Sequence, residues 1–242
     1  MGYIYKLFFT LLLLLGCLLN GQNIKVTKVQ DVIRLLTNQF NSYRTYRCRF
    51  KEISRGRFLK GYLKYKKPHH LYLKYFDENS VPYTEIYVSP KKLYIYFIQM
   101  RIVCEENISK ENQQHFKAAN TSYKRLLMLY NFNFQEAKTP VTVLSENEIK
   151  KFRLTQNKSP RAFHFALTPK DVSIGLDYYN LWIDTRGFIR RSRSRTMDNR
   201  IVDIYFYDIE KNIDIPANEF LFEVPAKARV IKNSLLDNQK KN

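Results

Sequence analysis

The side chains that most often carry catalysis or bind metal ions are few in this chain. Its four histidines have no cysteine or carboxylate partner at a spacing typical of a metal site. The sequence contains no phosphate-binding loop, no Gly-x-Ser-x-Gly nucleophile and no paired-carboxylate motif. We therefore predict a protein that is not an enzyme, with no metal ion and no cofactor. The histidines are His69, His70, His115 and His164.

The N-terminus has the pattern of a secretory signal peptide, residues 1–21. One early cation precedes an apolar run over residues 7–19, and small polar residues follow it. The run is short for a membrane span, so we expect cleavage after Gly21, with a retained membrane anchor as an alternative. The stretch LLGC, which ends at Cys17, resembles a bacterial lipobox and makes lipidation of Cys17 another alternative. In each case residues 22–242 are predicted to be extracytoplasmic, in the periplasm.

The other two cysteines, Cys48 and Cys104, lie far apart in the sequence. Export permits a disulfide between them, whereas cysteines on separate strands are more often buried as free thiols. The sequence leaves both states open.

The net charge of +19 suits nucleic acid, an anionic membrane surface or an acidic partner protein. An exported protein meets little nucleic acid, so we predict no nucleic-acid partner. The most basic stretch is RRSRSR, and on a strand Arg191, Arg193 and Arg195 would share one face. We interpret these three arginines as a basic docking surface, with an ordinary solvated strand face as the alternative.

Helical spacing is found at two places. Apolar residues from Val29 to Tyr43 recur at helical intervals and predict an amphipathic helix over residues 27–42. A second stripe, from Tyr123 through Tyr130 to Phe134, predicts another helix, and residues 141–150 are ambiguous between a loop and a short helix.

Alternating patterns separated by short turns dominate the rest of the chain. Short connections predict an antiparallel meander, and a meander of this length must curl. The predicted fold class is therefore α+β, mainly β. We expect about eleven strands in a curved antiparallel meander that forms an incomplete half-barrel, with two or three helices over its concave face. The strands are predicted at residues 46–54, 58–66, 70–76, 83–89, 93–103, 151–156, 161–168, 178–184, 188–196, 201–207 and 220–224. Residues 233–242 are predicted to be a disordered tail.

Three segments together resemble the periplasmic carriers of outer-membrane lipoproteins, the LolA-like family. The first is GYLKYKKPHHLYLKY, residues 61–75, which matches the family's glycine, apolar strand, Arg-Pro and aromatic strand, with Lys67 in the place of the arginine. The second is KKLYIYFIQMRIV, residues 91–103. The third is the C-terminal part, with LTPKD, LWIDTRGFIRR and a closing Phe-x-Phe-x-x-Pro segment that ends at Pro225.

The resemblance implies a half-barrel chaperone that binds lipoprotein acyl chains in an apolar cavity and ferries them from the inner to the outer membrane. Its expected partners are acylated lipoproteins as cargo, an inner-membrane lipoprotein-releasing transporter and an outer-membrane acceptor, and the protein would be a monomer. The main alternative is an acceptor of the same fold, lipid-anchored through Cys17, or one protein with both roles. A regulatory lipoprotein sensor and a basic adhesin or nucleic-acid binder are further alternatives.

The resemblance also implies roles for particular residues. The family's arginine before proline is thought to hold a helical lid closed through backbone carbonyls, so Lys67 is the candidate lid latch. A lysine lacks the planar fork of arginine, so we expect an easier opening; the alternative is that Lys67 simply reaches solvent at the strand end. The expected walls of the acyl-chain cavity are Leu63, Tyr65, Leu71, Leu73, Leu93, Ile95 and Trp182, with Leu126, Leu127 and Tyr130 from the lid.

Overall fold

The computed structural model describes residues 28–108, 130–135, 139–154, 159–170, 176–196 and 198–232. The predicted signal peptide, Cys17, Leu126, Leu127 and the tail at residues 233–242 lie outside these ranges. Within them, no helix combines the length and the apolar character needed to cross a membrane.

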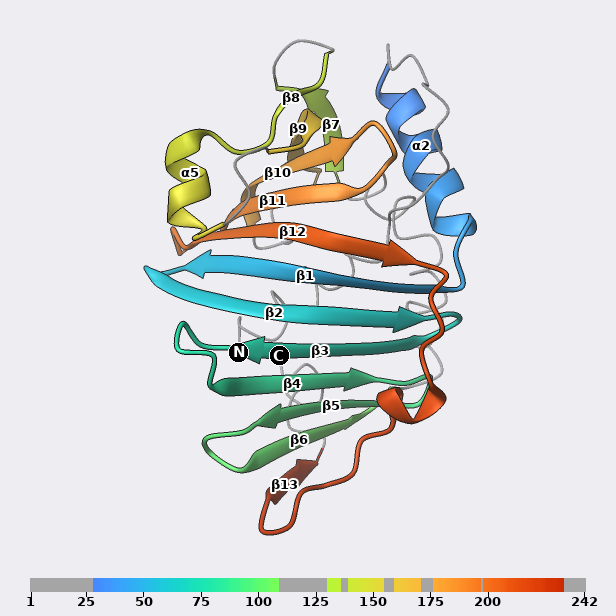
Figure 1. The fold of residues 1–242 in the computed structure, drawn as a ribbon, viewed down its shortest axis with the longest axis vertical. Helices are drawn as coiled ribbons and strands as arrows, with labels where there is room; N and C mark the ends of the chain where they lie inside the picture. The colour runs from blue at the N-terminus through green and yellow to red at the C-terminus, as the bar shows by residue number, and fades with distance from the viewer. Residues whose placement is uncertain are drawn as a thin grey trace.

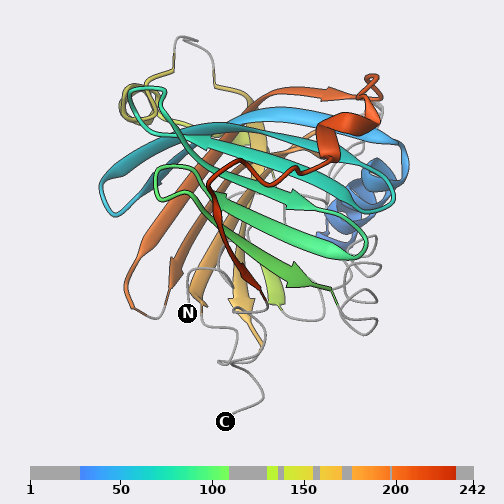
Figure 2. The ribbon, with the colours of Figure 1, turned by 90° about the horizontal axis from the view of Figure 1, so that it is seen from below.

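A single curved sheet of thirteen strands forms the body of the protein (Figure 1). The strand order is β13-β6-β5-β4-β3-β2-β1-β12-β11-β10-β9-β7, and β8 also pairs with β9. All neighbours are antiparallel except β13 and β6, which are parallel. The sheet is open, and its two halves curl toward each other (Figure 2). The strands are β1 (Thr45–Ser54), β2 (Arg57–Lys66), β3 (His70–Phe76), β4 (Pro82–Val88), β5 (Lys92–Phe97), β6 (Ile102–Asn107), β7 (Tyr130–Phe134), β8 (Val141–Thr142), β9 (Arg161–Pro169), β10 (Leu176–Asp184), β11 (Ile189–Thr196), β12 (Ile201–Lys211) and β13 (Arg229–Lys232).

The predicted architecture is confirmed as an open, curved, mostly antiparallel sheet, but the predicted elements differ from it in detail. Residues 93–103 form a hairpin, β5 and β6, instead of one bent strand. Tyr130–Phe134, expected to be helical, is strand β7. The predicted last strand at residues 220–224 overlaps a 3-10 helix, η3 (Ala217–Phe220), and β13 follows it.

Two α-helices are present in the described part of the chain, and they lie on opposite faces of the sheet. Helix α2 (Val29–Asn41) is amphipathic and buries Val32 and Leu36 in the largest apolar cluster. Helix α5 (Glu146–Lys151) is capped by Ser145, whose hydroxyl accepts a hydrogen bond from the Glu148 amide. Of the described helices, α2 therefore covers the concave face, whereas α5 lies on the opposite face. The prediction was two or three helices on the concave face, and the described residues place one there.

The concave face of the sheet, here called the inner face, carries the main core. Strand alternation sends every second residue to it, and one cluster joins residues from both halves of the sheet with Val32 and Leu36 of α2. At Gly61 the Phe50 ring lies directly over the backbone of β2, at a place where a Cβ atom would be 2.5 Å from a ring carbon. Helix α2 reaches the turn between β10 and β11, where Gly187 takes a positive φ of 86° beside Leu35.

The outer, convex face is covered at two places. Helix α5 and its flanks pack on a cluster that contains Val143, Phe152 and Trp182. The segment between β12 and β13 crosses the outside of β2–β5 (Figure 1) and packs Ile215 and Phe220 against tyrosines of these strands.

Candidate functional site

Most of the residues predicted to line an acyl-chain cavity lie together on the inner face. Seven of them belong to the main cluster: Leu63, Tyr65, Leu71, Leu73, Leu93, Ile95 and Tyr130. The strand register arranges six of them in two rows that cross β2 to β5. One row is Leu63, Leu73, Ile86 and Ile95; the other is Tyr65, Leu71, Val88 and Leu93. The inner face therefore presents a continuous apolar surface across β2–β5.

Trp182, the remaining described member of that predicted set, lies on the outer face. Its neighbours Leu181 and Ile183 take the inner positions of β10, so alternation directs Trp182 outward. Its ring stacks on His164 with centroids 4.0 Å apart, and the Arg191 guanidinium carbon lies 4.6 Å from its centroid. Trp182 therefore belongs to the cluster beneath α5.

Lys67 lies at the junction between α2 and the sheet. It follows the last residue of β2, and its backbone N–H donates a hydrogen bond to the Arg44 carbonyl at 2.8 Å. Its ammonium nitrogen is 4.9 Å from the centroid of the Tyr43 ring, and partial burial lowers the pKa of Lys67. Tyr43, two residues beyond α2, in turn meets Tyr65 edge-to-face with centroids 6.0 Å apart. Lys67 thus touches the segment that leads out of the helix.

Glu52 is a polar inner-face residue that the sequence reasoning missed. On β1 it continues the alternation of Cys48 and Phe50, both of which are in the inner cluster. Burial raises the pKa of the Glu52 carboxyl to about 7, because a carboxylate is poorly solvated beside apolar side chains. The alternation on β1 was the signal that could have located it.

The three arginines predicted to form a docking surface lie on the outer face of β11, but they are not equally exposed. Arg191 is 3% exposed and makes two hydrogen bonds to Asp203, at 2.9 and 2.7 Å. It also donates to Glu148 of α5 at 2.6 Å and to the Val143 carbonyl at 3.1 Å. Arg193 approaches Asp203 at 3.8 Å. Because Arg191 is buried and paired, it is not available for docking, and it attaches α5 to the sheet instead.

Arg195 differs from the other two arginines in its described contact. Its guanidinium carbon lies 4.8 Å from the centroid of the Tyr178 ring. A docking role for Arg193 and Arg195 stays a prediction.

Both described cysteines are buried, and they do not form a disulfide with each other. Cys48 and Cys104 belong to the inner cluster, and burial raises the pKa of the Cys48 thiol to about 12. Burial therefore disfavours the reactive thiolate form of Cys48 in the folded protein. Within the described residues, no group of histidines, cysteines and carboxylates is arranged to hold a metal ion.

Comparisons with known proteins place the fold but give no function. No family model matches the sequence, and no curated protein matches it. An uncharacterized conserved protein from Thermus thermophilus has a similar structure, with a TM-score of 0.55 and 9% identity over 85% of this chain and 99% of that chain.

Two other solved structures show weaker similarity. Lipoprotein LppX of Mycobacterium tuberculosis has a TM-score of 0.45 and 6% identity, over 78% of this chain and 100% of that chain. A LolA superfamily protein from Nitrosomonas europaea has a TM-score of 0.36 and 9% identity, over 81% of this chain and 98% of that chain. The open curved sheet that the sequence predicted is present, and the TM-score of 0.55 indicates that the Thermus thermophilus protein shares this fold.

Proposed function

We propose that this protein binds the acyl chains of lipoproteins on its inner face and carries them through the periplasm from the inner to the outer membrane. The observation that supports this most directly is the pair of apolar rows across β2–β5, which lie in one cluster with α2. Each methylene removed from water contributes about 0.8 kcal/mol, so exposing an acyl chain of ~16 carbons to water costs on the order of 13 kcal/mol.

In this proposal, α2 moves away from the sheet when cargo binds. Val32 and Leu36 are buried against the inner face in the closed form, and acyl chains would take their place. Because acyl chains would replace the apolar side chains of α2 on the inner face, the net free energy of cargo binding would be small. The carrier would therefore hold cargo more tightly than water does and less tightly than a membrane does, which permits release without an energy source.

The proposed partners follow from this role. Acylated lipoproteins are the cargo, an inner-membrane lipoprotein-releasing transporter is the donor, and an outer-membrane acceptor receives the cargo. The carrier is an exported monomer with no enzymatic activity, and its net charge of +19 suits acidic docking sites on both membrane partners.

A second candidate function is a membrane-anchored acceptor of the same fold, favoured by the LLGC stretch that ends at Cys17. The mass of the mature N-terminus distinguishes the two. Cleavage after Gly21 supports the carrier, and an acylated N-terminal Cys17 supports the acceptor.

A loading assay tests acyl-chain binding. The protein, purified after export of the full chain, is mixed with a triacylated lipoprotein in detergent, the detergent is diluted away, and the mixture is separated by gel filtration. We expect co-elution, and we expect it to be lost when the acyl groups are removed. Aggregation of the lipoprotein, with this protein eluting alone, would contradict the proposal.

A further inference from the structure

The inner face of β11 carries hydroxyl groups where the neighbouring strands carry large apolar side chains. Ser192 pairs with Leu181 on one side and with Ile204 on the other. Both of these partners belong to the inner cluster, so the register places Ser192 on the inner face as well. It is 4% exposed.

Ser194, the next inner residue of β11, repeats this arrangement. It pairs with Tyr179 and Val202 and is 7% exposed. A strand that served only to fill an apolar core would be expected to carry valine or leucine at these two positions, because a buried hydroxyl must find a hydrogen-bond partner.

Two polar residues of β1 lie in the same two rows. Ile204 pairs with Ser192 and also with Glu52, and Val202 pairs with Ser194 and also with Ser54. Only β12 separates β1 from β11. The spacing between neighbouring strands therefore puts the Cα atoms of Glu52 and Ser192 roughly 10 Å apart. The register thus gathers four polar residues, here called the polar patch, in one part of the inner face: Glu52, Ser54, Ser192 and Ser194. The inner face also carries other buried polar residues, such as Glu106 opposite Leu93.

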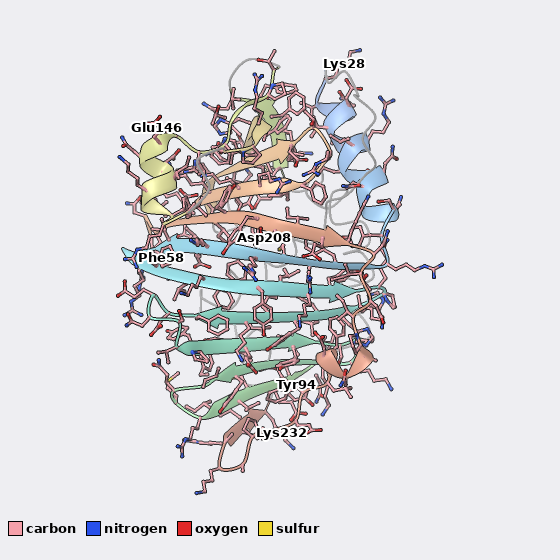
Figure 3. All side chains as sticks on the ribbon, in the orientation of Figure 1. Lys28, Phe58, Tyr94, Glu146, Asp208 and Lys232 are labelled. Atoms are coloured by element: carbon pink, nitrogen blue, oxygen red, sulfur yellow. The ribbon has the colours of Figure 1, made fainter. Side chains whose placement is uncertain are left out.

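The polar patch is displaced from α2 along the strands. Helix α2 packs on the Gly187 turn, where β11 begins, and the patch lies further along β11 and near the end of β1. Figure 3 labels Phe58 at the end of the sheet away from α2, and Phe58 pairs with Ile53, the residue after Glu52. The two apolar rows across β2–β5 and the polar patch therefore occupy different parts of one inner face.

Glu52 is the member of the patch that titrates. Burial raises the pKa of its carboxyl to about 7, so both the protonated and the ionised form are populated near neutral pH. The protonated form donates a hydrogen bond to a carbonyl oxygen, and the ionised form accepts one from a hydroxyl or an amide. The group that faces it electrostatically is Tyr75 of β3, whose own pKa is raised by burial and by Glu52.

We propose that the polar patch binds the ester linkages of an acylated glycerol while its acyl chains lie along the apolar rows. The serine hydroxyls donate to the ester carbonyl oxygens, and the protonated carboxyl of Glu52 donates to another ester oxygen. The ligand class is thus a diacylglyceryl group, as opposed to any apolar chain. This inference rests on the proposed function, because it assumes that acyl chains enter the inner face.

Two short-chain lipids that differ only in their linkages test the proposal. Dihexanoylphosphatidylglycerol carries ester carbonyls, and its dihexyl ether analogue lacks them. Titration calorimetry with the exported full-length protein, below the micelle concentration of each lipid, gives both dissociation constants. We expect the ester lipid to bind about tenfold more tightly, since hydrogen bonds from two serine hydroxyls favour it.

The double variant Ser192→Ala/Ser194→Ala locates the preference. We expect it to bind both lipids with equal affinity and to bind the ether lipid as the unchanged protein does, which also shows that it is folded. Ser80→Ala, at an exposed turn serine, is the matched control and should keep the full ester preference.

The other possible outcomes of the lipid titrations separate a failure of the polar patch from a failure of the proposed function. Equal binding of both lipids by the unchanged protein, or an ester preference that survives in the double variant, would overturn the polar patch and leave acyl-chain binding intact. Failure of both lipids to bind, together with a negative loading assay, would overturn the proposed function and this inference with it.

Discussion

The ammonium nitrogen of Lys67 lies 4.9 Å from the centroid of the Tyr43 ring, and this contact joins β2 to the segment just beyond α2. A cation held against an aromatic face is worth about 0.5–2 kcal/mol, depending on how far it is desolvated. The lowered pKa of Lys67 has burial as its cause, which indicates that the site is partly desolvated. Under the proposed function, this contact would favour a closed position of α2 without locking it.

We predict that Lys67→Leu leaves loading intact but impairs the transfer of cargo to an acceptor. Leucine keeps an apolar surface beside the inner face, so acyl chains still bind. It removes the charged contact that re-forms when α2 closes, so closure competes less well with bound cargo. Loading is measured by gel filtration and transfer by the appearance of lipoprotein on an acceptor. Lys67→Arg is the control and should keep both steps; unchanged transfer in Lys67→Leu would show that Lys67 is not a latch.

Arg191 gives a prediction about stability. Its removal would leave Asp203 buried without its partner, and loss of one member of a buried pair costs about 3–5 kcal/mol. We expect Arg191→Leu to lower the free energy of unfolding by about that amount in urea titrations, and to loosen α5, which Arg191 holds through Glu148. The matched control is Arg49→Leu on β1, where the exposed pair with Asp208 is worth less than about 1 kcal/mol. Equal losses in the two variants would mean that the buried network does not stabilise the fold.

The inner row positions on β2 were predictable from the sequence because β2 alternates between buried and partly exposed residues. Leu63 and Tyr65 have polar or partly exposed neighbours, so only one side of the strand can face a core. Trp182 was assigned to the wrong face because Leu181 and Ile183 are equally apolar. Both faces of β10 are covered, and alternation cannot distinguish them.

Three other misassignments have separate physical causes. Tyr130 and Phe134 are four residues apart, a spacing that fits one face of a helix and one face of a strand equally well. The burial of Arg191 depends on Asp203 and Glu148, which reach it through the pairing of β11 with β12 and the docking of α5. The hairpin of β5 and β6 was missed because no glycine marks its turn, where Arg101 takes the positive φ of 53°.

Gly61→Ala tests the close packing of the inner face. A Cβ atom at this position would be 2.5 Å from the Phe50 ring and would also overlap the Lys74 carbonyl oxygen, which belongs to the sheet backbone and cannot move freely. We expect a loss of about 1–3 kcal/mol in the free energy of unfolding, as overpacking typically costs. Gly56→Ala is the comparison, because Gly56 has open space around it and only its positive φ of 72° opposes the change. A smaller loss at Gly61 than at Gly56 would argue against the tight contact.

The raised pKa of the Glu52 carboxyl predicts how the free energy of unfolding depends on pH. Its pKa is raised in the folded protein from an ordinary value of 4.5 to about 7, so the folded state holds this proton more tightly than the unfolded chain does. The stabilisation is complete below pH 4.5 and is lost as the pH rises through 7, with an amplitude of about 2 kcal/mol for a partly buried carboxyl.

The variant Glu52→Gln isolates this contribution, because glutamine has the shape of the protonated acid and does not titrate. The lowered pKa of His70 acts in the opposite direction, since it opposes folding below about pH 6.5, but it is common to both proteins and cancels in their difference. In urea titrations we expect nearly equal stability of the two proteins at about pH 4, below the ordinary pKa of 4.5, and at about pH 8 we expect Glu52→Gln to be the more stable by about 2 kcal/mol. A constant difference across this range would show that Glu52 ionises as freely in the folded protein as in the unfolded chain, and that its carboxyl does not lie against the apolar inner face.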